Sequence, residues 1–188
     1  FRQTVIKTTL VSVPEAIAKK DTDSIAFTWT EPNEREFRYS LTSKLRVANN
    51  FFEIKNKPVF PVRKISGELF EYTKATEFID ITKEIEVKAR EIIGPISLDE
   101  DLYEIVFKVA DWTRNNIEYS LNTLTAEVDQ KSSWVLENRQ GVCDEMTNLF
   151  ISFLRSLGVP ARFISGVVYS NVHNDFSNHG WAEVYFPN

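Results

Sequence analysis

The sequence predicts an α+β protein, in which a β-rich first part is followed by helices packed on a second group of strands. Three observations lead to this class. Apolar and polar residues alternate through much of the region before Asp80, which is the period of strands with one buried face. Beyond Asp80 the apolar residues recur with helical spacing. After Gly158 and Pro160, which end a helix, the alternation returns.

The N-terminal strands are separated by residues that favour turns, such as Pro32-Asn33 and Ser66-Gly67. Several short strands with turns between them are typical of a small antiparallel sheet or sandwich. We therefore predict a β-rich domain or sandwich-like extension over residues 1–80 and a second domain over residues 81–188. The strands expected in the first domain are residues 3–13, 24–30, 35–47, 51–54 and 67–79.

Three helices and two strands are expected in the second domain. The middle helix begins at a capping box, with Ser97 as the N-cap and Glu100 three residues later. Residues 121–142 are polar and irregular apart from a short apolar segment at Trp134. The expected helices are residues 82–93, 97–116 and 143–157, and the expected strands are residues 161–170 and 179–186.

The composition excludes several classes of protein. With 43% hydrophobic residues in 188, the chain can bury a core, which disordered chains cannot do. The 22 Lys and Arg against 27 Asp and Glu give a net charge of −5, which disfavours nucleic acid as a partner. One cysteine and two histidines allow neither an internal disulfide nor a multi-cysteine zinc site, so no metal or cofactor is expected.

The chain begins at Phe1 and contains no apolar window of membrane-spanning length. We interpret it as a processed product or an excised piece. Contact with a membrane is expected only through a segment outside this chain.

Cys143 is the main candidate for chemistry. It lies where a loop containing Gly141 meets the start of a helix, and the free amides and dipole of a helix N-terminus favour a thiolate. A thiolate is a nucleophile. The alternative, a small buried core residue, would place the cysteine more naturally within the apolar stripe of the helix.

His179 is the second candidate, because it opens the last expected strand. A strand that follows a helix can bring its first residues beside the N-terminus of that helix. A histidine in that place can take the thiol proton and return it, since it titrates near neutral pH. Cys143 and His179 together are more informative than either residue alone.

Three segments around these residues resemble the core of the transglutaminase-like superfamily, especially its microbial and archaeal members. They are GVCDE at 141–145, LGVPAR at 157–162 and HGWAEVY at 179–185. The resemblance covers roughly residues 98–188 and implies a papain-like core, with a cysteine-bearing helix on an antiparallel sheet. No motif is recognised in the β-rich first part.

The resemblance implies that Cys143 is the nucleophile and His179 the general base and acid. In the family an aspartate on the next strand orients the imidazole, about fifteen residues past the histidine. That position lies beyond Asn188, so we expect the core to be incomplete at its C-terminus. Asp175 precedes the histidine and is a poor substitute, and Asp144 is interpreted as support for the helix dipole.

The expected function is acyl transfer on protein or peptide amides through a thioester, as in a protease, amidase or transglutaminase. Tyr119 or Trp134 could donate to the oxyanion, although both are interpreted mainly as packing residues. The alternative is a non-catalytic binding or structural module with the same fold. The resemblance favours an extracytoplasmic or membrane-tethered protein. The oligomeric state stays open.

Overall fold

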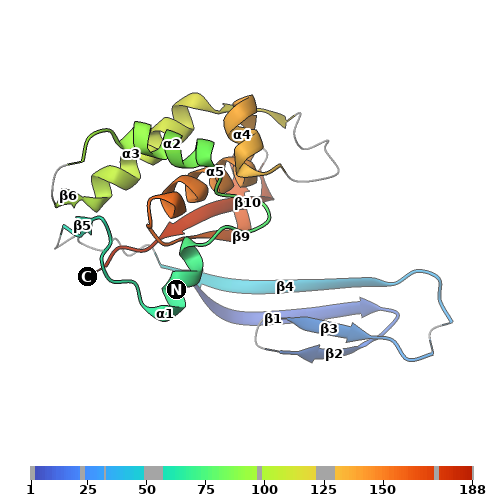
Figure 1. Ribbon diagram of the computed structural model, residues 1–188. Coiled ribbons are helices and arrows are strands. Elements are labelled where there is room, and N and C mark those ends of the chain that lie inside the picture. Colours follow the sequence, from blue (N-terminus) through green and yellow to red (C-terminus); the bar gives the residue numbers. More distant parts are fainter. Residues whose placement is uncertain are drawn as a thin grey trace. The chain divides into compact units, whose positions relative to one another are not determined.

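The computed structural model describes residues 3–21, 24–31, 33–48, 57–96, 99–121, 130–171 and 174–187 (Figure 1). The strand expected at 51–54 lies outside the described residues. The chain forms two compact units, residues 1–53 and 54–188. The division expected after residue 80 remains a prediction, and each unit is described by itself. The mixed helices and strands confirm the α+β class.

The first unit consists of two antiparallel strand pairs. β1 (Gln3–Val13) pairs with β4 (Arg38–Val47), and β2 (Ile17–Lys20) pairs with β3 (Ile25–Thr28). β1, β3 and β4 confirm the strands expected at 3–13, 24–30 and 35–47, whereas β2 was not expected. Aromatic rings join the pairs: the ring of Phe27 lies 5.1 Å from that of Tyr39. Trp29 donates its indole N–H to the carbonyl of Pro14 at 2.8 Å, which ties β3 to the end of β1.

Residues 67–79 do not form the expected strand. They begin with the short helices α1 (Gly67–Phe70) and η1 (Glu71–Thr73), and an irregular segment follows. This segment is held by contacts that the local sequence does not reveal. The buried Arg155 donates to the carbonyl of Lys74 at 2.6 Å, and the hydroxyl of Ser152 donates to the carbonyl of Asp80.

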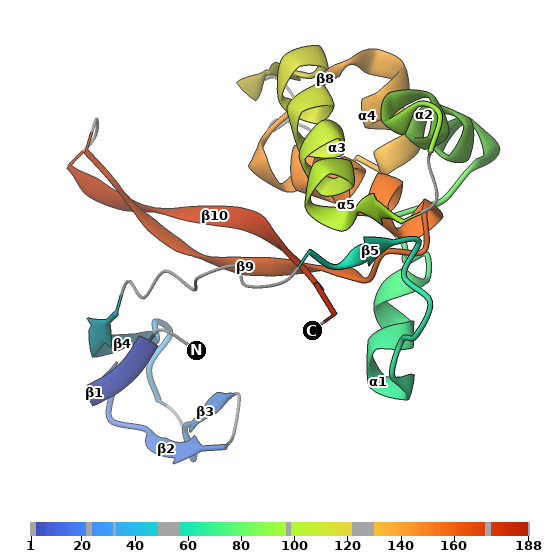
Figure 2. The ribbon, with the colours of Figure 1, turned by 90° about the vertical axis from the view of Figure 1, so that its left-hand side faces the viewer.

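Four longer helices form the centre of the second unit. α5 (Cys143–Ser156) contacts α2 (Lys83–Ile93), α3 (Leu102–Asn116) and α4 (Ser132–Asn138), as Figures 1 and 2 show. Its core residues are fully buried: Leu149, Ile151, Phe153 and Leu154. α5 is therefore the central helix of this unit, and its first residue is Cys143.

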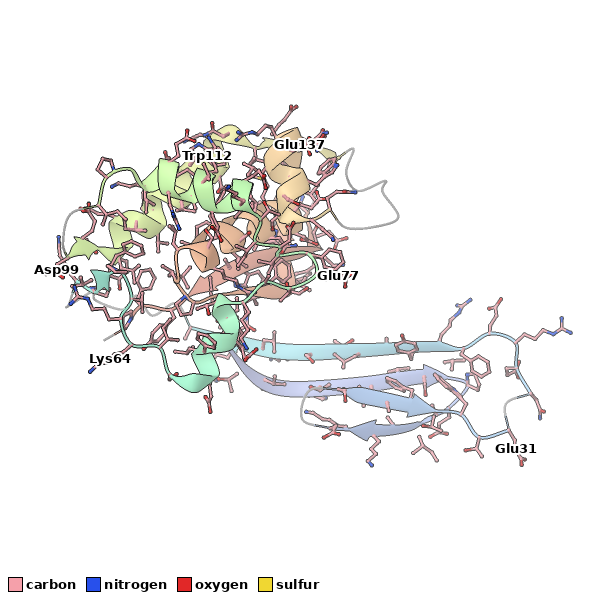
Figure 3. The ribbon with its side chains drawn as sticks, in the orientation of Figure 1. Glu31, Lys64, Glu77, Asp99, Trp112 and Glu137 are labelled. Atoms are coloured by element: carbon pink, nitrogen blue, oxygen red, sulfur yellow. The ribbon has the colours of Figure 1, made fainter. Side chains whose placement is uncertain are left out.

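Trp112, a residue of α3 that is labelled in Figure 3, connects this helix to its neighbours. Its ring packs edge-on against Phe153 of α5, with the ring centres 5.4 Å apart. The guanidinium carbon of Arg139 lies 4.7 Å from the centre of the same ring. These contacts join α3 to α5 and to the turn that precedes Cys143.

Two details of the helices differ from the sequence prediction. α3 begins at Leu102, and its N-cap is Asp101, whose carboxylate accepts from the N–H of Tyr103 at 2.9 Å. Glu100 lies instead in β6 (Glu100–Asp101), which pairs with β5 (Val59–Phe60), while Ser97 lies outside the described residues. The helix α4 was not expected, because its seven residues fall in a stretch that reads as irregular.

The last two strands form a long antiparallel ribbon, which extends past the helices in Figure 2 with β10 drawn above β9. β9 (Ala161–Ser170) pairs with β10 (Asp175–Val184) along their whole length. Phe163, Ala182 and Val184 pack against the core from one face of the ribbon. A short parallel pair, β7 (Glu118–Tyr119) with β8 (Gln140–Gly141), precedes α5.

None of the helices among the described residues is long and apolar enough to cross a membrane.

Candidate active site

A buried carboxylate fixes the turn that presents Cys143. Glu145 is only 3% exposed, and one of its oxygens accepts from the N–H of Val142 at 2.9 Å. Its other oxygen accepts from the N–H of Gln130 at 3.3 Å. Gly141 leaves room for this arrangement, because a Cβ there would lie 3.1 Å from the Cβ of Glu145. The buried carboxylate of Glu145, the third residue of α5, thus holds the first turn of this helix.

Tyr119 lies against Cys143 from β7. The parallel pairing sets Tyr119 beside Gly141, and the N–H of Ser120 donates to the carbonyl of Gly141 at 3.1 Å. The pKa of Tyr119 is raised by partial burial and then by the charge of Cys143 and a hydrogen bond to its side chain. The phenol is therefore close enough to the sulfur to interact with a group bound there, which its possible role as a hydrogen-bond donor to the oxyanion requires.

Gly180 brings β10 against the first turn of α5. Its carbonyl accepts from the hydroxyl of Thr147 at 3.4 Å, and its backbone forms a hydrogen bond with Cys143 that lowers the pKa of the thiol. A Cβ at position 180 would lie 2.9 Å from Oδ1 of Asp144 and 2.5 Å from the ring of Phe163. Glycine at position 180 therefore leaves room for the side chains of Phe163 and Asp144 where the strand meets the helix.

His179 is the neighbour of Gly180, so the strand carries it to the vicinity of Cys143. It lies in the middle of β10 opposite Gly166, not at the start of the strand as the sequence suggested. Its ring is 6.3 Å from that of Trp181. Because side chains alternate along a strand, these two rings lie on the face of the ribbon opposite to the one that packs on α5.

The thiol of Cys143 has a different partner in this structure. Sγ donates to Oδ1 of Asp144 at 2.9 Å, and among the described residues no hydrogen bond joins it to His179. Burial raises the pKa of the Cys143 thiol, and the hydrogen bond that the thiol donates to Asp144 raises it further, against the lowering effect of the backbone of Gly180. Burial and Asp144 therefore shift this pKa in the direction opposite to the one expected for a thiol at a helix N-terminus.

The remaining candidates have other roles. Asp175 is exposed at the start of β10, and its carboxylate accepts from the N–H of Phe176 at 2.7 Å. His179 lies four positions further along the extended strand, about 13 Å from Asp175. Trp134 of α4 packs against the core. Within the described ranges no three His, Cys, Asp or Glu side chains are grouped so that they could hold a metal ion.

The sequence reasoning did not identify the role of Glu145. A signal was available, because glutamate at the third position of a helix often bonds back to the residue before the helix. The sequence reasoning also interpreted Asp144 as support for the helix dipole and did not place its carboxylate beside the thiol.

Comparison with known proteins covers this whole region. Residues 73–188 match the model of the Transglutaminase-like superfamily, which is more than half of the chain. The chain belongs to this superfamily. The matched residues include Cys143, Asp144, His179 and Gly180.

Individual relatives are more distant. A Bacillus subtilis (strain 168) protein, "Uncharacterized protein YebA", is 24% identical in an alignment of 168 positions that covers 77% of this chain and 22% of YebA. A crystal structure of "a Putative Cysteine Protease" from Cytophaga hutchinsonii is 20% identical, with a TM-score of 0.75 over 98% of this chain and 63% of that one. A "putative protease" from Parabacteroides distasonis ATCC 8503 is 14% identical over 98% of this chain and 37% of that one, with a TM-score of 0.45.

The chain therefore spans about a fifth of the length of YebA and less than two thirds of the Cytophaga protein. The shared fold agrees with the transglutaminase-like assignment. Membership of the superfamily supports a cysteine-based catalytic function in general terms.

The glycine at position 180 gives a first testable consequence. Gly180→Ala places a methyl group against Asp144 and Phe163, so we expect β10 to shift away from α5 and the protein to lose about 1–3 kcal/mol of stability. Thermal unfolding followed by circular dichroism measures the loss. Gly67→Ala is the matched control, because a Cβ there meets nothing within 4 Å. If the Gly180→Ala variant unfolded at the wild-type temperature, the close packing described above would be contradicted.

Proposed function

We propose that this protein carries a cysteine-nucleophile acyl-transfer domain, which cleaves protein or peptide amides through a thioester. Cys143 is the nucleophile, and His179 is the general base and then the general acid. The observation that carries the proposal is the presentation of Cys143 at the first residue of the central helix, where the strand bearing His179 is held against it through Gly180. Membership of the transglutaminase-like superfamily supports the same reading.

The reaction follows from the chemistry of these groups. The imidazole of His179 accepts the proton of the Cys143 thiol, and the sulfur attacks the amide carbon. The negative charge that develops on the carbonyl oxygen needs hydrogen-bond donors, for which the backbone N–H of Cys143 and the hydroxyl of Tyr119 are our candidates. Imidazolium then protonates the departing amine, which leaves a thioester on Cys143.

His179 has to approach the sulfur for the first step, since the thiol is bonded to Asp144 in this structure. In this structure the imidazole lies on the face of the ribbon opposite to α5, so the strand or the side chain must move to bring it to the sulfur. Catalytic hydrogen bonds are often long or poorly aligned without substrate. An aspartate that orients the imidazole would be supplied outside the described residues.

Hydrolysis is the outcome we favour over cross-linking. Tyr119, which lies against the sulfur, is 60% exposed, so water has access to a thioester on Cys143. Transfer to an amine requires that water be excluded from the intermediate. The second candidate function is a non-catalytic binding module, and the raised pKa of the Cys143 thiol is the observation in its favour.

A two-channel assay on the full-length protein separates these outcomes. With fluorescent casein and a biotinylated primary amine present together, a hydrolase releases soluble peptides and attaches little biotin to casein. A transglutaminase attaches biotin without releasing peptides. Neither signal, from folded protein offered a range of peptide amides, would favour the binding module and overturn our proposal.

A further inference from the structure

Asp144 occupies a position beside the nucleophile that the proposed reaction does not use. Its Oδ1 accepts a hydrogen bond from Sγ of Cys143 at 2.9 Å. Both residues belong to the first turn of α5 and are partly buried. The carboxylate of Asp144 is therefore the hydrogen-bond acceptor of the Cys143 thiol in this structure.

The position of the Asp144 carboxylate is constrained from β10 as well as from its own helix. A Cβ on residue 180 would lie 2.9 Å from Oδ1 of Asp144, so the glycine there leaves room for the oxygen in this position. The hydroxyl of Thr147, one helical turn along α5, holds the carbonyl of the same glycine at 3.4 Å. Oδ1 is thus packed between helix and strand, next to the sulfur.

The other groups around the thiol do not offset this negative charge. From β7 the neutral phenol of Tyr119 faces the sulfur, and from β10 the backbone of Gly180 does so. Glu145, the other acid of the turn, is directed to the N–H groups of Val142 and Gln130. Among the described residues no lysine or arginine forms an ion pair with Asp144.

A carboxylate that accepts from a thiol favours the protonated sulfur, and it repels the thiolate once the proton has left. The direction of the shift at Cys143 agrees, because the bond and the charge of Asp144 both raise the pKa of the thiol after burial has done so. We propose that Asp144 keeps Cys143 in its protonated, weakly reactive form until the proton is passed to His179. The role of the sulfur in this inference rests on the function proposed above.

This arrangement has a chemical consequence besides catalysis. Only the thiolate reacts readily with alkylating and oxidising agents. A resting cysteine held as a thiol is protected from both, although it lies at the accessible end of α5 and is only partly buried. The protection can be measured without any substrate.

The test is Asp144→Asn in the full-length protein. The rate of iodoacetamide addition to Cys143 is followed from pH 6 to pH 10 by mass spectrometry of the peptide that carries it. Removing the carboxylate charge is expected to move the midpoint of the rate profile down by about one pH unit, so that alkylation at pH 7 becomes about tenfold faster. Asp144→Ser, which also lacks the charge, should move the midpoint in the same direction.

The matched control is Asp175→Asn, which removes an exposed carboxylate from the start of β10 and should leave the profile unchanged. Thermal unfolding confirms that each variant is folded. A profile that stays in place or moves up in both Asp144 variants would overturn the inference. A profile that moves down in a protein without amidase activity would overturn the proposed function alone.

Discussion

Replacing Cys143 by alanine is expected to abolish amide hydrolysis, because no other cysteine of this chain can form the thioester. His179→Ala should reduce kcat by about 10⁴-fold, by analogy with the loss of a member of a catalytic triad. Both rates are measured as peptide release from labelled casein by the full-length protein. The effect is large because the sulfur, whose pKa is raised, depends on a base to remove its proton.

The control for the histidine is His173→Ala, since His173 is the other histidine of the chain, and its activity should equal that of the wild type. A second readout separates chemistry from folding. Cys143→Ala should still bind peptide and unfold at nearly the wild-type temperature, because the cysteine is only partly buried. Hydrolysis that survives the loss of Cys143 would refute its assignment as the nucleophile.

The fold could be predicted where the pattern is local. Alternation in residues 3–13 and 161–170 identified β1 and β9, and the stripe that follows Cys143 identified α5, ended at Gly158. Residues 67–79 were assigned wrongly because Phe70 and Tyr72 imitate alternation. What holds that segment is a tertiary hydrogen bond from a buried arginine of α5, which no local pattern reveals.

The second ribbon strand shows a related limit. Residues 171–178 are mostly polar and fall outside the strands expected from the sequence, yet β10 already begins at Asp175. The residues from Asp175 to Asn178 are exposed, so a polar sequence there is compatible with a strand. As a consequence His179 lies inside the strand, and the register with β9 sets the face of the ribbon on which its side chain lies.

The candidate site could be predicted in its residues but not in its electrostatics. The position of Cys143 at a helix start follows from Gly141 and the apolar stripe behind it. The general rule for helix N-termini would lower the pKa of such a thiol. Two acids follow the cysteine, and which of them faces the sulfur depends on packing with Gly180 and with the turn at Val142. That packing is tertiary, so the sign of the shift is not contained in the motif.

Glu145 should therefore matter for stability and for the nucleophile together. Glu145→Ala removes the acceptor from the buried N–H of Val142 and from that of Gln130, at a cost of about 3 kcal/mol. The turn before α5 would loosen, so we also expect at least a tenfold fall in kcat with a smaller change in KM. Chemical denaturation measures the first effect, and the casein assay measures the second.

Two further variants test this expectation. Glu145→Gln keeps one acceptor oxygen of the same shape, so it should recover about half of the lost stability and part of the activity. Glu137→Ala removes an exposed glutamate from α4, labelled in Figure 3, and should change stability by less than about 0.5 kcal/mol. If Glu145→Ala were no more harmful than Glu137→Ala, the buried carboxylate could not be what holds Cys143 in place. If stability fell while kcat did not, Glu145 would support the fold without positioning the nucleophile.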